Sequence, residues 1–220
     1  ILPVTAIADA YADSSTEVLF KGDRRAPYKT DTSASKKATA DLIDTPQTIQ
    51  VIGKEIIREQ GATTLTEALR NSAGVGTFYL GENGNTSTGD AIYMRGSDAS
   101  GSIFVDGVRD VASVSRDVFN IESVEVLKGA AGADIGRGSA TGAINLYSKH
   151  AAPHNFYNGS VAAGGGDFTR ATADLNWKLA ETAALRLNLM AQDAGVAGRN
   201  EIKNKRWGAA ASLGFGLGIL

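Results

Sequence analysis

Two histidines have the spacing of a metal site. His150 and His154 stand four residues apart, which on a helix would place both imidazoles on one face. Pro153 lies between them and no carboxylate follows nearby, so we do not expect a metal site. The chain has no cysteine, which excludes thiolate ligands and disulfide bonds. No combination of nucleophile, base and orienting residue can be assembled either. The sequence therefore does not predict an enzyme, and we expect no cofactor.

The glycine-rich stretch from Gly129 to Gly142 could cradle a phosphate group. A P-loop needs Gly-Lys followed by Ser or Thr, whereas the nearest text here is Gly136-Arg-Gly-Ser. Thr141 stands where the dinucleotide fingerprint needs its third glycine. Nucleotide binding is therefore not predicted. Glycine at this density instead indicates unusual backbone angles and close packing against another surface.

Charge and hydropathy exclude two further classes. A net charge of −2 with scattered Lys and Arg gives no surface for nucleic acid, so we expect no nucleic-acid partner. No run approaches the roughly 18 apolar residues that a membrane helix needs, although strands could still span a membrane. No basic region followed by an apolar region begins the chain, which favours a processed N-terminus.

Short helices and strands are expected to position the glycine-rich stretch. Thr64 with Glu67 forms a capping box that is expected to start a helix, and Gly74 is expected to end this helix. Residues 76–90 are polar and are expected to form an exposed loop. The remaining expected elements are strands at 48–52, 91–95, 102–105, 123–127 and 143–147 and a helix at 54–60, with 91–95 joined to 102–105 by a turn at 96–101.

After Pro153 the pattern changes to a period of two. Residues 171–179 are apolar at odd and polar at even positions, and the same phase returns in 185–192 and 207–217. With a segment around 158–163, these predict four antiparallel strands of about 9–11 residues, the length that crosses a membrane at a tilt. We expect short turns at 164–167 and 180–184 and a longer outer loop at 193–204. A soluble sandwich would also alternate, but outward Trp177 and Trp207 favour a membrane wall.

Four segments in order resemble the plug domain of TonB-dependent outer-membrane receptors. They read DTPQTIQVI (44–52), LTEALRNSAG (65–74), YMRG with FVDGV (93–96 and 104–108), and IESVEVLKG with GRGS and GAINL (121–146). Residues 74–84 and 113–117 are similar to the branch that takes up ferric catecholate siderophores. The resemblance implies an α+β plug domain, a small mixed sheet with short helices, followed by the first antiparallel strands of a transmembrane β-barrel of about 22 strands. Because four strands cannot close such a barrel, we expect the barrel to be truncated here.

The resemblance also implies a domain order and a function. A mobile N-terminal arm would span residues 1–35, the plug 36–152 and the start of the barrel 153–220. The protein would lie among the lipids of the outer membrane of a Gram-negative bacterium. There it would bind and transport ferric siderophores, with iron entering only as part of the ligand. A second hypothesis stays open, in which the fragment acts as a soluble periplasmic interaction domain without transport.

Site residues follow from the same resemblance. Leu2, Pro3, Val4, Thr5 and Ala6 resemble a TonB box, which the periplasmic C-terminal domain of TonB would capture by strand addition; the alternative is a frayed terminus. Arg95 and Arg137 are expected to pair with glutamates on the barrel wall, the alternative being solvated side chains.

Siderophore contacts are expected in the outward loops. A ferric catecholate is a large anion with flat aromatic faces, so it suits arginines together with rings. The expected contacts are Phe78 and Arg116, followed by Tyr79, Asn83 and Arg109. The alternative is that these residues only keep the loops soluble.

Overall fold

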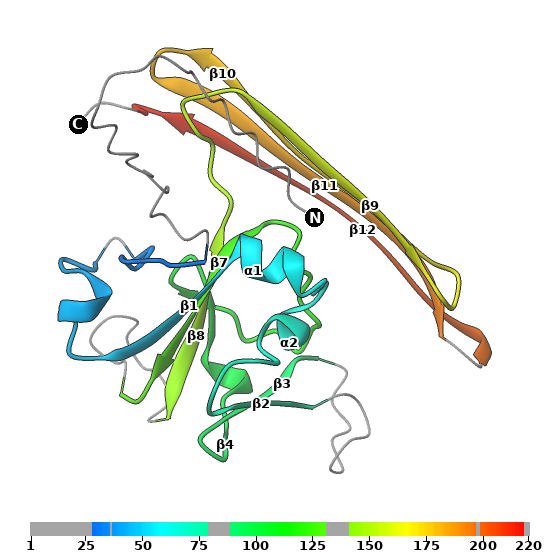
Figure 1. Cartoon of the computed structure of the whole chain (residues 1–220), viewed down its shortest axis with the longest axis horizontal. Helices are drawn as coiled ribbons and strands as arrows, with labels where there is room; N and C mark the ends of the chain where they lie inside the picture. The colour runs from blue at the N-terminus through cyan, green and yellow to red at the C-terminus, as the bar shows by residue number, and fades with distance from the viewer. Residues whose placement is uncertain (1–27, 36, 79–88, 131–140, 197–198, 218–220) are drawn as a thin grey trace, which may run out of the picture.

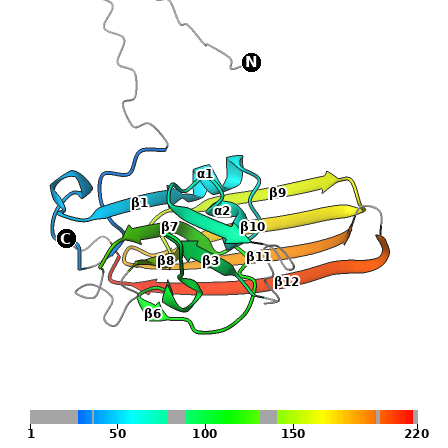
Figure 2. The ribbon, with the colours of Figure 1, turned by 90° about the horizontal axis from the view of Figure 1, so that it is seen from below.

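The chain forms two bodies, a small α/β unit and a long sheet that lies along one side of it (Figure 1; Figure 2). The computed structural model describes residues 28–35, 37–78, 89–130, 141–196 and 199–217. The α/β unit ends near residue 150, where the chain passes directly into the long sheet.

The main sheet of the α/β unit has the order β1-β7-β8-β5-β6. Only the pairing of β5 with β8 is parallel, and the other neighbours are antiparallel, so the sheet is mixed as expected. The strand predictions at 48–52, 123–127 and 143–147 are confirmed. The strands are β1 (Thr48–Gly53), β5 (Ile103–Val105), β6 (Val108–Arg109), β7 (Ile121–Lys128) and β8 (Gly142–Ser148).

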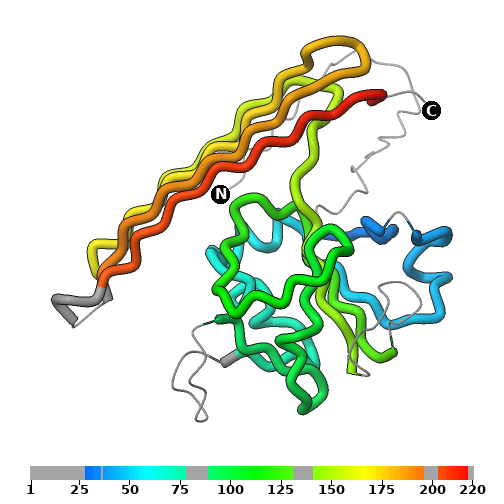
Figure 3. Tube along the Cα trace, turned by 180° about the vertical axis from the view of Figure 1, so that it is seen from behind, coloured from blue at the N-terminus to red at the C-terminus, as the bar shows by residue number. Residues whose placement is uncertain are grey.

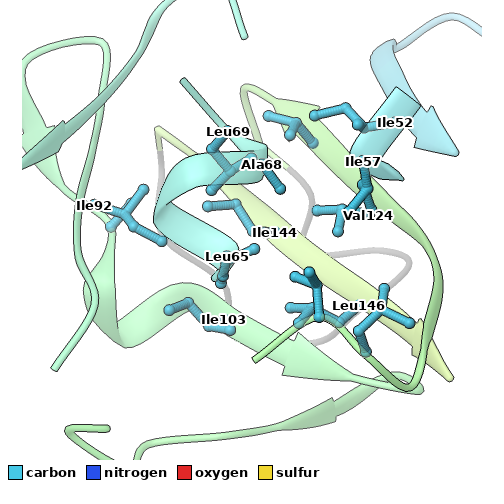
Figure 4. Packing of buried hydrophobic residues seen from close by; sticks show 14 of the residues in the cluster. Ile52, Ile57, Leu65, Ala68, Leu69, Ile92, Ile103, Val124, Ile144 and Leu146 are labelled. Carbon is cyan, nitrogen blue, oxygen red and sulfur yellow. The ribbon is translucent and has the colours of Figure 1, made fainter. Parts of the chain in front are cut away.

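Two short helices cover one face of this sheet. They are α1 (Lys54–Glu59) and α2 (Leu65–Ala68), preceded along the chain by a 3-10 turn, η1 (Leu42–Asp44). The capping box of Thr64 and Glu67 is present as predicted, but α2 ends at its C-cap Leu69 and not at Gly74. Leu65 and Leu69 are fully buried against sheet residues such as Ile144 (Figure 4). The core of the unit therefore lies between α2 and the main sheet.

A second, three-stranded sheet corrects two predictions. It consists of β2 (Val75–Phe78), β3 (Ala91–Met94) and β4 (Ser97–Asp98), in that order. The loop predicted from residue 76 therefore begins as a strand. The strands predicted at 91–95 and 102–105 are present as β3 and β5, but no single turn at 96–101 joins them, because β4 and the 3-10 turn η3 (Ser100–Ser102) lie between them and β5 joins the main sheet. The turn η3 carries the chain from one sheet to the other.

The long sheet has the order β12-β11-β10-β9, with every pair antiparallel (Figure 3). Its strands are β9 (Phe156–Gly164), β10 (Phe168–Ala180), β11 (Ala183–Val196) and β12 (Arg199–Phe215). The number of strands, the phase of alternation and both short turns are confirmed. The predicted length is wrong, since the last three strands have 13, 14 and 17 residues. The predicted outer loop at 193–204 is mostly strand, with Asp193 opposite Lys205.

The two faces of the long sheet differ in chemistry. Even positions face the α/β unit and bury polar side chains, including Asn176, Arg186, Asn188 and Gln192. Odd positions face away, where Val161, Trp207 and Phe215 are 85%, 84% and 75% exposed. Among the described residues, no helix combines the length and the hydropathy needed to cross a bilayer.

Candidate functional site

Arg116 occupies the centre of a buried ion cluster. Its Nε donates to Oδ2 of Asp110 at 2.9 Å, and its Nη1 donates to Oδ2 of Asp90 at 3.1 Å. Nη1 and Nη2 also donate to the carbonyl oxygens of Val114 and Ala112. The Arg116 and Asp90 side chains are only 8% and 1% exposed. We call Asp90, Asp110 and Arg116 the Arg116 cluster.

The Arg116 cluster joins segments that are far apart in the sequence. Asp90 accepts hydrogen bonds from the backbone N–H of Arg116 at 3.1 Å and from the hydroxyl of Thr66 in α2 at 2.9 Å. The Arg116 guanidinium holds the pKa of the Asp110 carboxyl below its usual value, and a hydrogen bond from the backbone N–H of Ala112 acts in the same direction. Both carboxylates are hydrogen-bonded to the guanidinium and to neutral donors, which offsets the cost of burying them.

Asp117, the next residue, binds the α/β unit to the long sheet. Its two carboxylate oxygens accept from Nη1 and Nη2 of Arg170 in β10 at 2.9 and 2.7 Å, a bidentate pair. Arg206 in β12 approaches Oδ2 of Asp117 at 3.2 Å. Oε1 of Gln192 in β11 accepts from both arginines, at 2.7 and 3.0 Å. Asp117 is thus held by arginines of β10 and β12, and Gln192 of β11 links these two arginines.

A second ion cluster lies further along the interface between the α/β unit and the long sheet, which we call the seam. Arg186 of β11 forms a bidentate pair with Asp174 of β10, with both distances 2.7 Å. Across the seam, Glu122 approaches Arg186 at 3.2 Å and Lys149 approaches Asp174 at 3.1 Å. Burial lowers the pKa of Lys149, although Asp174 opposes that shift. The α/β unit is therefore fixed to the long sheet by charges at two points.

The N-terminal segment reaches the opposite face of the main sheet. The hydroxyl of Ser33 donates to both carboxylate oxygens of Glu125, at 2.8 and 3.0 Å, and the N–H of Ala34 donates at 2.6 Å. Glu125 is 1% exposed. Burial and the nearby Glu125 raise the pKa of Tyr147, which stands beside them. Residues 33–35 were predicted to belong to the mobile arm, yet 33 and 34 bind the sheet directly. The domain boundaries at 35/36 and 152/153 stay predictions.

The structure places the predicted ligand contacts in different settings. Arg109 is exposed at the end of β6, where its Nε donates to the carbonyl of Gly101 at 2.7 Å. Arg116 is buried and donates four hydrogen bonds to Asp90, Asp110, Ala112 and Val114, and its contact with a ligand stays a prediction. Phe78 ends β2 opposite Ala91. Tyr79 and Asn83 lie outside the described residues.

Of the other predicted site residues, only Arg95 lies within the part of the chain that the structure describes. Arg95 is exposed, with a φ of 51°, and its N–H donates to the carbonyl of Gly74. Its pairing with a glutamate stays a prediction. Arg137 and the box Leu2, Pro3, Val4, Thr5 and Ala6 lie outside the described residues. Among the residues that are described, no group of three or more acidic or histidine side chains could hold a metal ion.

Sequence reasoning missed the partners across the seam. Asp117, Arg170, Gln192 and Arg206 received no role, although charged residues at even positions of an alternating strand are a usable signal. In a strand whose odd positions are apolar, an even-position arginine must face polar partners or water. Asp90 had no local signal, because its partner Arg116 is 26 residues away.

The fold and the seam define a class: a small mixed-sheet domain held by ion pairs against the polar face of long antiparallel strands. Residues 41–143 match the family model described as the TonB-dependent Receptor Plug Domain. The chain belongs to the TonB-dependent receptors, with the α/β unit as the plug and the long sheet as the first strands of the barrel.

Three relatives show how far the similarity extends. The catecholate siderophore receptor Fiu of Escherichia coli strain UTI89 is 46% identical over 211 residues, covering 96% of this chain and 28% of the relative. The crystal structure of the ferric-catecholate import receptor Fiu from E. coli K12, closed form, matches with a TM-score of 0.81 and 49% identity, covering 87% of this chain and 27% of that one. The siderophore receptor PiuA from Acinetobacter baumannii matches with a TM-score of 0.79 and 39% identity, over the same shares. The chain thus spans about 28% of the length of the curated relative.

Proposed function

We propose that the full-length protein is a receptor in the outer membrane of a Gram-negative bacterium that binds a ferric siderophore of the catecholate class and transports it. The observation that carries this proposal is the two-faced long sheet. Its inner face holds the plug through Asp117, Arg170 and Arg206, while its outer face exposes large apolar side chains such as Trp207. Such a wall suits a lipid bilayer on one side and a polar, plugged lumen on the other.

The catecholate class is supported by chemistry and by the relatives. Two of the relatives above are named as catecholate or ferric-catecholate receptors. A ferric catecholate needs a cation for its negative charge and rings for its aromatic faces. Arg109 is exposed and can supply the cation, with Phe78, Tyr79 and Asn83 as further contacts. Iron enters only within the ligand, so no resident cofactor is proposed.

Energy would come from TonB, whose periplasmic domain would bind the N-terminal arm. Leu2, Pro3, Val4, Thr5 and Ala6 would add as a strand to the periplasmic domain of TonB. The first described anchor of the arm on the buried part of the plug is the Ser33–Glu125 pair, so a pull on the arm would load this pair. Arg95 and Arg137 are proposed to pair with glutamates on other strands of the barrel.

The second hypothesis, a soluble periplasmic interaction domain, gains no support. All three relatives are named as receptors, which also agrees with the expectation that the chain is not an enzyme. The outward face of the long sheet would expose Val161, Trp207 and Phe215 to water.

Growth of an iron-starved deletion strain tests the proposal. The strain carries the full gene and receives one ferric siderophore at a time, from the catecholate and hydroxamate classes. We expect the gene to restore growth on ferric catecholates and not on hydroxamates. Rescue by no ferric siderophore would overturn transport, and rescue by hydroxamates alone would overturn the catecholate class.

A further inference from the structure

The segment that joins the plug to the long sheet has no regular secondary structure. Residues 149–155 follow β8 and precede β9, and they form neither helix nor strand (Figure 1). We call these residues the linker. The backbone N–H and C=O groups of such a segment need hydrogen-bond partners from outside it, often water. Here, polar side chains of the long sheet supply several of these partners.

Two of these side chains come from β11 and β12. Nη1 of Arg186 donates to the carbonyl of His150 at 2.9 Å. Oγ of Ser212 accepts from the N–H of Ala151 at 3.2 Å. Arg186 and Ser212 stand directly opposite each other in the register of their strands. The linker backbone is therefore bonded to two neighbouring strands at one level of the sheet.

Asn176 of β10 makes three hydrogen bonds to the linker and is fully buried. Its Oδ1 accepts from the N–H of Ala152 at 3.0 Å, and its Nδ2 donates to the carbonyls of Ala152 and His154 at 2.8 and 2.6 Å. Both amide N–H donors and the amide oxygen are thus used. Asn176 stands opposite Arg186 in the register, so Asn176, Arg186 and Ser212 form one row across three strands. We call these three residues the linker row.

The N-terminal end of the plug is held differently. Among the described residues before β1, which are 28–35 and 37–47, none is buried. Ser33 bonds to Glu125 of the main sheet, and Tyr28 bonds to Glu59 at an exposed position. β1, which follows, is an edge strand, so it can leave the sheet without breaking any strand pairing except that with β7. The two ends of the plug are therefore attached unequally.

We propose that the linker row is an anchor: it fixes the C-terminal end of the plug to the barrel wall while TonB moves the N-terminal end, so that the plug rearranges without leaving the barrel. The pull by TonB rests on the proposed function. Asn176 is then a positioning residue that acts through the linker. Withdrawing the linker would leave the buried amide of Asn176 without partners, which costs more than the hydrogen bonds themselves contribute.

Two variants of the full-length receptor remove different numbers of these hydrogen bonds. Asn176→Leu keeps the approximate size of the side chain and removes all three bonds to the linker. Ser212→Ala is the milder change, since it removes one bond and leaves the buried Asn176 in place. Asn204→Leu makes the first substitution at an exposed position of β12 and is the matched control.

Hydrogen exchange of the purified receptor measures the anchoring itself. We expect exchange to become about tenfold faster at the N–H of Ala152 in Asn176→Leu and at the N–H of Ala151 in Ser212→Ala, the scale of one lost hydrogen bond. Exchange in β7 and β8 should stay unchanged, as should exchange of the linker in Asn204→Leu. Wild-type exchange at both linker positions would overturn the anchor.

A leak assay measures whether the anchor holds against TonB. The deletion strain carries one receptor gene and receives ferric tris-catecholate together with vancomycin, a large antibiotic that an intact outer membrane excludes. If Asn176→Leu frees the linker, the pull displaces the whole plug and opens the barrel. We therefore expect vancomycin to stop growth with Asn176→Leu but not with wild type or Asn204→Leu, and growth to return when TonB is deleted. A leak that persists without TonB, or no leak at all, would overturn the anchor.

Failure of the proposed function gives a different result. The wild-type receptor would then take up no ferric tris-catecholate, and hydrogen exchange would still decide about the linker row. Faster exchange confined to the linker would support the attachment of the plug to the wall. Unchanged exchange would overturn it.

Discussion

The ring of Phe119 in the plug lies directly against Gly208 in β12. A Cβ on Gly208 would stand 2.8 Å from Cζ of Phe119, and so this strand position admits only glycine while the ring stays in place. The carbonyl of Phe119 also accepts a hydrogen bond from Lys149 at 2.8 Å. The plug and the wall therefore meet here by shape, between the two ion clusters of the seam.

Gly208→Val is expected to disrupt the packing of the Phe119 ring against β12. Overpacking a close interface destabilises by about 1–3 kcal/mol, and thermal unfolding of the purified receptor should move to lower temperature. Ala209→Val, on the outward face of the same strand, is the matched control and should leave the transition unchanged. An unshifted transition in Gly208→Val would show that Phe119 does not need this space.

Asp117→Asn is expected to loosen the plug more strongly. It leaves Arg170 and Arg206 buried together without their carboxylate, and breaking a buried pair typically destabilises by about 3–5 kcal/mol. The measurement is the rate at which an added protease cleaves the plug in the folded receptor. Asp193→Asn is the matched control, since its pair with Lys205 is 52% and 62% exposed and should contribute about 0–1 kcal/mol. Equal cleavage rates in the two variants would contradict the role of Asp117 in holding the plug against the long sheet.

Ser33→Ala is expected to release the arm from the main sheet. The hydroxyl donates to both oxygens of the buried Glu125, and hydrogen bonds to charged groups are worth about 1.5–3 kcal/mol. Trypsin should therefore cleave faster after Lys29. Thr32→Ala, at the exposed preceding position, should cleave at the wild-type rate. No acceleration in Ser33→Ala would mean that other contacts hold the arm.

Acid is expected to weaken the Arg116 cluster through Asp110. The folded protein lowers the pKa of this carboxyl below its ordinary value of 3.8, so its contribution to stability is complete above that value. The contribution is lost as the pH falls through the lowered pKa. The difference in thermal transition between wild type and Asp110→Asn should therefore be present at neutral pH and shrink below about pH 4. A difference independent of pH would exclude Asp110 as its source.

Local signals predicted local structure well. Alternation located the strands of the long sheet, and the Thr64–Glu67 capping box located α2, because each signal depends on residues within one element. The predicted strands are too short because apolar alternation indicates only the part of each strand whose odd positions carry apolar side chains. Backbone pairing continues past it through Asp193 and Lys205.

Long-range contacts could not be predicted in the same way. The sheets that β3 and β5 join depend on partners far along the chain, which no local pattern records. An arginine in a polar loop looks the same whether it meets a ligand or a buried carboxylate. The sequence predicts Arg116 as a ligand contact from its charge and its loop, and it does not show the buried partner Asp90, which is 26 residues away.

Uptake of iron-labelled ferric tris-catecholate by the deletion strain tests transport most directly, with the full gene in wild-type form or as Val4→Pro. Proline removes the N–H that strand addition to TonB would use. We predict uptake by wild type, and surface binding without uptake by Val4→Pro at equal receptor levels. Wild-type uptake by Val4→Pro would contradict coupling through residues 2–6, and no uptake by the wild-type gene would contradict transport of a ferric catecholate.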